Sequence, residues 1–255
     1  MHPRESRRLL PLAGFAIFIG LWYAVALSGF FPSGQLPRPD EVVSAVVEGF
    51  RNEGLGKDVQ LSVLRVLIGV LIGSALAVPV GFVLAWYRTL RTMFDPLVSF
   101  FRALPPIALI PLVIVYLGIG ETARLSILTY AAFFSAVVVV YEGVASIDEI
   151  YIRAARSMGA KPMEIFTRVV FPLTVPQVLV AVRVALGVSW ATLVAAELIA
   201  ARRGLGATIQ SAANFFQIDM IYGGVALIGL CALVMDRILA VLSKRLTNWQ
   251  DRVER

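Results

Sequence analysis

Two ionisable residues, Arg183 and Glu197, lie in an otherwise apolar segment at residues 174–200. Charged side chains are costly within a bilayer, so an apolar segment that keeps them is a candidate for handling a charged solute. Steps of 4 and 3 residues lead from Arg183 to Gly187 and Trp190, and the same two steps lead on to Glu197. On a helix these positions share one face, so the spacing predicts that this face lines a solute pathway, narrowed at Gly187 and Trp190.

The two charges are too far apart to hold one small molecule together. Along a helix with a rise of about 1.5 Å per residue, Arg183 lies about 10 Å past Pro176, and Glu197 lies about 21 Å further. A guanidinium at Arg183 suits an anionic group, and a carboxylate at Glu197 suits an ammonium group or a basic residue of a partner protein. Two structural alternatives stay open, because Arg183 could extend to lipid head groups and Glu197 could cap structure at the outer surface.

A third candidate is Arg102, which precedes Pro105 and Pro106 in the apolar segment 97–117. Proline has no backbone N–H, and it leaves the carbonyl four residues earlier without its helical donor. Within lipid such a carbonyl needs a partner from a neighbouring helix or from water. Either a packing kink or an irregular helix beside the pathway is therefore expected here.

The chain offers no residues for bond chemistry. His2 is its only histidine and Cys231 its only cysteine. A disulfide, a thiolate metal site and a Ser/His/Asp or Cys/His set are therefore excluded. The sequence also contains no G-x-x-x-x-G-K-[ST] phosphate loop. We expect no catalytic residue, no cofactor and no metal in this chain.

The composition requires a membrane. Hydrophobic residues make up 58% of the 255, charged residues 16%, and the mean hydropathy is +0.81. A soluble domain cannot bury that much apolar surface. A spanning helix needs roughly 20 apolar residues, and six segments qualify: 11–29, 61–86, 97–117, 123–141, 174–200 and 221–243. We predict an all-α polytopic protein with six transmembrane helices. Residues 1–59 would form an anchor helix and an external amphipathic segment, and 60–249 the transmembrane domain.

Basic residues indicate the orientation. They gather at both ends of the chain, after the second apolar segment, and in a polar loop at 148–172. With six spans these regions share one side, which the positive-inside rule identifies as cytoplasmic, so both termini are expected inside. Arg202 and Arg203 are the exception, on the far side. This distribution points to membrane lipid rather than nucleic acid as the reason for the net charge of +6.

The polar loop 148–172 reads as two short helices lying nearly parallel to the membrane surface. Ser146 and Glu149 have the spacing of a capping box, which predicts a helix start. Gly159 fits the end of that helix, and Pro162 fits the first turn of a second. The first helix carries two alanines, which let a partner approach its backbone, and three apolar anchors, Ile150, Tyr151 and Met158. It suits a groove on another protein, and an amphipathic loop on anionic lipid is the alternative.

The same loop resembles the EAA loop of importer-type ABC transporter permeases. That pattern is an acidic residue, two alanines, three residues, a glycine, nine residues, then an aliphatic residue, any residue and Leu-Pro. This chain keeps the spacing and departs from the pattern at three positions, Arg153, Val169 and Phe171. Further runs, at 104–121, 190–206 and 242–249, are similar to permeases for nitrate, sulfonates and taurine, so the resemblance covers roughly residues 60 to 249.

The resemblance implies a type I importer permease with the MetI-like fold, in the bacterial inner membrane. Its partners would be a second permease copy, two cytoplasmic ATPases that bind ATP and Mg, and a periplasmic or lipid-anchored binding protein. The cargo would be a small sulfonate such as taurine, and the alternative cargoes are another small anion, such as nitrate or an alkanesulfonate, or a heterocycle. The alternative class of protein is a secondary transporter that needs no ATPase. Arg153 in place of the acid leaves the polarity of the ATPase contact open. The coupling role falls on Arg153, Ala154, Ala155, Ser157, Met158, Gly159 and Pro172.

Overall fold

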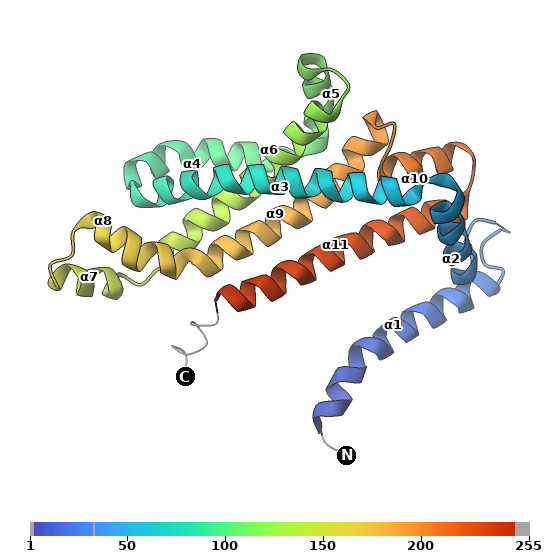
Figure 1. Cartoon of the computed structure of the whole chain (residues 1–255), viewed down its shortest axis with the longest axis horizontal. Helices are drawn as coiled ribbons and strands as arrows, with labels where there is room; N and C mark the ends of the chain where they lie inside the picture. Colours follow the sequence, from blue (N-terminus) through green and yellow to red (C-terminus); the bar gives the residue numbers. More distant parts are fainter. Residues whose placement is uncertain (1–2, 33, 248–255) are drawn as a thin grey trace.

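The chain folds entirely into helices over the residues that the computed structural model describes, which are 3–32 and 34–247 for the backbone. Side chains are described for residues 13–32, 34–198 and 201–247. His2 and the C-terminal Arg252 and Arg255 lie outside these ranges. Figure 1 shows the elements: α1 (Pro3–Leu27), α2 (Pro39–Glu48), α3 (Leu55–Trp86), α4 (Arg88–Ala103), α5 (Pro106–Leu117), α6 (Glu121–Ala145), α7 (Glu149–Ser157), α8 (Pro162–Ile165), α9 (Phe171–Ala200), α10 (Leu205–Asn214) and α11 (Ile218–Leu246), with π-helical turns η1 (Gly49–Glu53) and η2 (Phe166–Val170).

Four helical stretches are long and apolar enough to cross a membrane: α3, α6, the stretch Pro162–Leu198, and α11. A fifth arises if α4 and α5 count as one span, although they meet at a bend of 92°. The irregularity expected within the span 97–117 is therefore present as a sharp bend between α4 and α5. Leu104 and Pro105 are extended there, because a residue before proline avoids the helical region. The first expected span, 11–29, coincides with α1, whose described side chains form the apolar stretch Ala13–Leu27.

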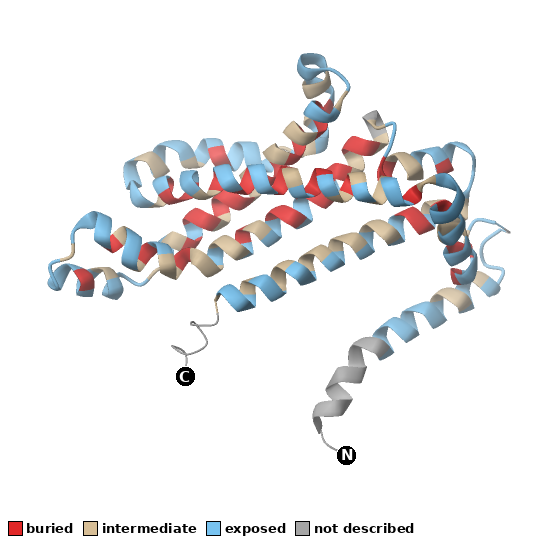
Figure 2. Ribbon diagram, viewed as in Figure 1, coloured by how far each residue is buried: buried red, intermediate tan, exposed pale blue. Residues whose placement is uncertain are grey.

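The core lies where α3, α6 and α9 pack together. Figure 2 shows the buried residues concentrated on these three helices, while α11 is mostly half-buried or exposed. Glycines let α3 approach α6 closely, as small residues do between membrane helices. A Cβ added to Gly73 would lie 2.5 Å from the Ala132 Cβ, and one on Gly81 would lie 2.7 Å from Val140. The three helices therefore form a tightly packed unit.

The apolar helix α1 runs away from this unit, and its C-terminal part lies against α2 and the segment before it (Figure 1). There Trp22 Nε1 donates to the carbonyl of Pro37 at 3.0 Å, and the Tyr23 hydroxyl donates to Asp40 at 2.6 Å. The hydrogen bond from Tyr23 holds the pKa of the Asp40 carboxyl below its usual range.

Helices α7 and α8 lie at one end of the long helices, and α2 and α10 lie at the other (Figure 1). These four short helices therefore mark the two ends of the long helices.

Candidate functional site

The helix α7 begins at a residue other than the one expected. Asp148 is its N-cap, and the Asp148 side chain accepts a hydrogen bond from the Ile150 N–H at 2.9 Å. The predicted cap at Ser146 is wrong, because Ser146 still has helical backbone angles and its hydroxyl donates to the carbonyl of Gly143 at the end of α6. A short link through Ile147 therefore separates α6 from α7.

Gly159 ends α7 as predicted. Its φ is +82°, and its N–H donates to the Arg156 carbonyl at 2.9 Å. That left-handed conformation favours glycine. Pro162 then opens α8, but α8 does not form a separate surface helix. Through η2 it continues into α9, so that Pro162–Leu198 is a single helical stretch of 37 residues.

The surface of α7 combines apolar and basic side chains. Ile150 and Tyr151 are exposed, and Met158 is 82% exposed. Of the residues assigned to coupling, Arg153, Ala154, Ser157 and Gly159 are also exposed, and Pro172 is half-buried. Ala155 is only 4% exposed and belongs to the chain's own core. Therefore α7 offers an outward face with Met158 at its end, and Ala155 holds its inward face.

Arg183 forms an ion pair between two helices. Its guanidinium donates to both carboxylate oxygens of Asp236 on α11, each at 2.8 Å. The side chains of Arg183 and Asp236 remain 41% and 37% exposed. Asp236 was not predicted from the sequence, although it carries the same signal as Arg183: an ionisable residue within an apolar segment.

Glu197 lies at the centre of a polar cluster at the opposite end of α9. It is 1% exposed. Its carboxylate accepts from Arg65 Nη1 at 2.6 Å and from the Ser62 hydroxyl at 2.8 Å. Arg65 also donates to Glu121 at 2.5 and 2.8 Å, and Arg124 donates to Glu121 at 2.6 Å. We call these five residues, Ser62, Arg65, Glu121, Arg124 and Glu197, the outer cluster; it joins α3, α6 and α9.

The outer cluster also holds the start of α10. The first N–H groups of a helix need acceptors from outside it. The Gly206 N–H donates to Glu197 at 2.8 Å, and the Leu205 N–H donates to the Ser62 hydroxyl at 2.9 Å. A carboxylate also interacts favourably with a helix N-terminus. This arrangement favours the structural alternative, in which Glu197 caps another part of the chain, because donors of the chain itself occupy its carboxylate.

The predicted pathway face is divided by the fold. Gly187 is exposed, and a Cβ added to it would meet no atom within 4 Å. Trp190 is 4% exposed and lies in the main core. Arg102 is exposed in the last turn of α4, next to the 92° bend. The open part of the face therefore carries Arg183 and Gly187, whereas Trp190 packs inward. Arg65 was likewise not predicted from the sequence, although it is a charged residue within the apolar segment 61–86.

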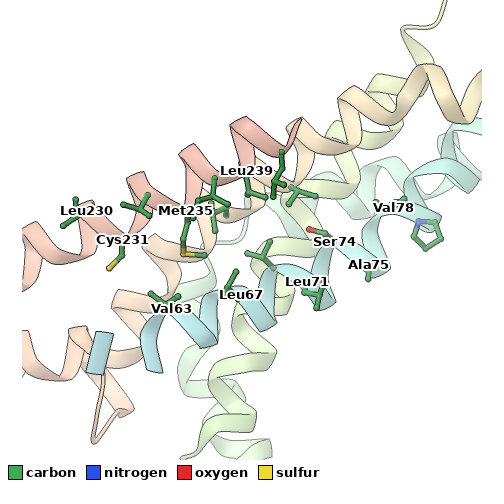
Figure 3. A pocket seen from close by; sticks show the side chains of 17 residues that line it. Val63, Leu67, Leu71, Ser74, Ala75, Val78, Leu230, Cys231, Met235 and Leu239 are labelled. Carbon is green, nitrogen blue, oxygen red and sulfur yellow. The ribbon is translucent and has the colours of Figure 1, made fainter. Parts of the chain in front are cut away.

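A large groove runs between α3 and α11. Its volume is about 950 Å³, and Figure 3 shows that Leu67 and Leu71 face Met235 and Leu239 across it. Its lining residues include no charged side chain, and the hydroxyl of Ser74 is one of its few polar atoms. The groove suits hydrocarbon, either a lipid chain or another apolar helix, and it offers no recognition for an ionic solute.

Comparisons with known proteins agree with this architecture. The sequence matches the family described as "Binding-protein-dependent transport system inner membrane component" over residues 66–248. A probable ABC transporter permease protein of Brucella abortus (strain 2308) is 46% identical over 252 residues, which are 99% of this chain and 100% of that protein. The taurine transport system permease protein TauC of Escherichia coli (strain K12) is 33% identical, over 99% of this chain and 94% of that protein.

Two more distant proteins extend the comparison. The nitrate import permease protein NrtB of Synechococcus elongatus is 28% identical, over 88% of this chain and 84% of that protein. The fold is similar to that of a chain in the inward-facing MetNI methionine ABC transporter, with a TM-score of 0.61 and 24% identity over 73% of this chain and 95% of that chain. At that identity the likeness shows the MetI-like permease fold alone. The chain belongs to the binding-protein-dependent transport system inner membrane components, and it is the permease subunit of an ABC importer in the taurine, sulfonate and nitrate subfamily.

Proposed function

We propose that this permease imports a small sulfonate such as taurine, driven by separate ATPase subunits that bind ATP and Mg. The observation that carries the coupling is α7, which ends at Gly159 and presents Met158 to a partner. The observation that favours taurine is the 33% identity to TauC over nearly the whole of both chains. Two copies of the chain, two cytoplasmic ATPases and a periplasmic or lipid-anchored binding protein make up the transporter. It lies in the inner membrane with six spans and both termini inside.

The continuous helix Pro162–Leu198 carries movement from the ATPase side to the outer side. At about 1.5 Å per residue it is about 55 Å long, enough to cross the hydrocarbon core. One end of this stretch, α8, follows α7 after a short turn, and the other end carries Glu197 in the outer cluster. A displacement of α7 by the ATPase therefore moves α9 as a rigid rod and shifts the outer cluster and α10 with it.

The pathway lies along the open part of the α9 face, at Arg183 and Gly187, with Arg102 at the bend between α4 and α5. Arg183 attracts the sulfonate of the solute while Asp236 holds the guanidinium in place. Glu197 contributes through the outer cluster rather than by direct contact with the solute, and Trp190 supports the face from behind.

Uptake into proteoliposomes tests the substrate. The permease, its ATPase and its binding protein are reconstituted, and ATP-dependent accumulation of taurine, nitrate and ethanesulfonate is compared. Accumulation of taurine at the highest rate supports the proposal. Accumulation of nitrate alone would identify the second candidate, a nitrate permease, which the relationship to NrtB favours. Accumulation without the ATPase would point to a secondary transporter.

A further inference from the structure

Arg202 and Arg203 are two basic residues that the membrane orientation does not explain. They follow α9, at the end of the molecule opposite α7, where the positive-inside rule disfavours arginine. Both are exposed, and within the described part of the chain neither forms an ion pair with a carboxylate. Neither membrane orientation nor an ion pair explains the two arginines at this position, and recognition of a ligand would explain them.

The two arginines line a small polar pocket of about 220 Å³. Glu53 and Asp58, from η1 and the start of α3, provide its carboxylates, and Ser211 of α10 provides a hydroxyl. Asp58 accepts from the Gly204 N–H at 3.1 Å and from the Thr208 hydroxyl at 3.5 Å, which still leaves acceptor capacity on its carboxylate. The pocket thus brings together two positive and two negative side chains, with a balanced total charge.

The outer cluster holds the turn that carries the arginines in one conformation. The Arg203 carbonyl accepts from Arg65 Nη1 of the outer cluster at 2.8 Å. Gly204 has a φ of +128°, and a Cβ there would overlap the Glu197 carboxylate. A side chain at Gly204 is therefore excluded by both strain and space. Because the backbone is fixed, the arginines are presented to the pocket without a loop having to order first.

We propose that this outer pocket binds a small zwitterion, with the acid group at Arg202 and Arg203 and the ammonium group at Glu53 and Asp58. A plain anion would gain the arginines but would also meet two carboxylates, so a neutral molecule that carries both charges fits better. The pocket volume of about 220 Å³ suits a small solute. The inference rests on the proposed function and narrows it from sulfonates in general to amino acids of the sulfonate type.

A cysteine placed in the pocket tests the proposal. Ser211→Cys is introduced into a Cys231→Ala background, and the permease–ATPase complex is labelled with a neutral maleimide in the absence of binding protein. Taurine at ten times its dissociation constant slows labelling about tenfold, because the rate follows the unoccupied fraction. Ethanesulfonate, which lacks the ammonium group, protects far less. Ala207→Cys is a second reporter on the same pocket, for use if Ser211→Cys does not assemble.

Variants of the charged side chains provide the controls. Arg202→Ala and Glu53→Gln abolish protection, whereas Arg51→Ala, an exposed residue outside the pocket, leaves it intact. The proposal is overturned if neither taurine nor β-alanine protects either cysteine, or if substrate-free binding protein protects while taurine does not; the latter outcome would identify a protein contact. Protection by β-alanine combined with no uptake of taurine by the intact transporter would retain the pocket and reject taurine as cargo.

Discussion

Arg65 of α3 and Glu197 of α9 form a buried ion pair, with 2.6 Å between Nη1 and Oε1. The side chain of Arg65 is 6% exposed and that of Glu197 is fully buried. Burying two charges is unfavourable unless their remaining hydrogen-bonding groups are satisfied. Here the Arg65 guanidinium also donates to Glu121. The Glu197 carboxylate also accepts from the Ser62 hydroxyl and the Gly206 N–H. The pair therefore fixes the position of α10 relative to the core.

Replacing Glu197 by alanine is predicted to destabilise the permease by about 3 kcal/mol, because Arg65 keeps its charge in a buried site after losing one partner. Thermal unfolding of the purified permease–ATPase complex measures the change. The double variant Arg65→Met/Glu197→Ala, compared with the single variants Arg65→Met and Glu197→Ala, serves as the control, because it removes both charges and is expected to lose less than the sum of the two single variants. Strict additivity of the two single losses would show that the residues do not interact.

Replacing Gly159 by valine is predicted to uncouple ATP hydrolysis from uptake. A β-branched residue is strained at a φ of +82°, so the end of α7 must rearrange. The number of ATP molecules hydrolysed per solute imported rises, while the protein remains inserted. Gly229→Val is the matched control, since Gly229 is an exposed glycine of α11 with no atom within 4 Å of an added Cβ. Equal ratios for the two variants would contradict the role of Gly159.

Replacing Met158 by alanine is predicted to weaken binding of the ATPase. Burial of a methionine side chain contributes about 1.5–3 kcal/mol, which corresponds to at least tenfold in affinity. Titration of the ATPase onto the solubilised permease gives the dissociation constant. Met93→Ala is the control, because Met93 is also exposed but lies on α4. If Met93→Ala and Met158→Ala bind the ATPase equally well, α7 is not the docking helix.

Exchanging the charges of Arg183 and Asp236 is predicted to preserve the fold and reduce uptake. The variant Arg183→Asp/Asp236→Arg retains an ion pair between α9 and α11 but moves the positive charge to α11. Stability is expected to stay near that of the parent, whereas single replacements lose the pair. Uptake of the sulfonate drops because the guanidinium no longer lies on the α9 face. Parental uptake by the exchanged variant would assign Arg183 a structural role alone.

Local rules predicted the end of α7 and the start of α8, whereas contacts between residues distant in sequence could not be predicted. Gly159 and Pro162 could be assigned from sequence because a left-handed stop and a first-turn proline depend on the residue itself. Arg183 and Glu197 could be singled out as charges within an apolar segment. Their partners could not be identified, because Arg65 is 132 residues from Glu197 and Asp236 is 53 from Arg183.

The break between α4 and α5 shows a similar limit. Pro105 and Pro106 marked an irregularity, but neither the 92° angle nor the packing of Ile110 of α5 against Ile127 of α6 and Ala196 of α9 follows from the sequence pattern. The cap of α7 was misplaced by two residues for a related reason. Both Ser146 and Asp148 are suitable caps, and the end of α6 uses the first of them.

The most direct measurement is the length of the Pro162–Leu198 rod during the ATPase cycle. Spin labels are placed at Met163→Cys and Ala191→Cys in a Cys231→Ala background, with labelled subunits diluted by unlabelled ones. The rigid coupling predicts a distance of about 42 Å, from 28 residues at about 1.5 Å each, that stays constant between nucleotide-free and ATP-bound transporters while Met158 moves relative to its partner copy. A shortening of several ångströms on ATP binding would mean that η2 bends, and it would contradict transmission of movement from α7 to Glu197 by a rigid helix.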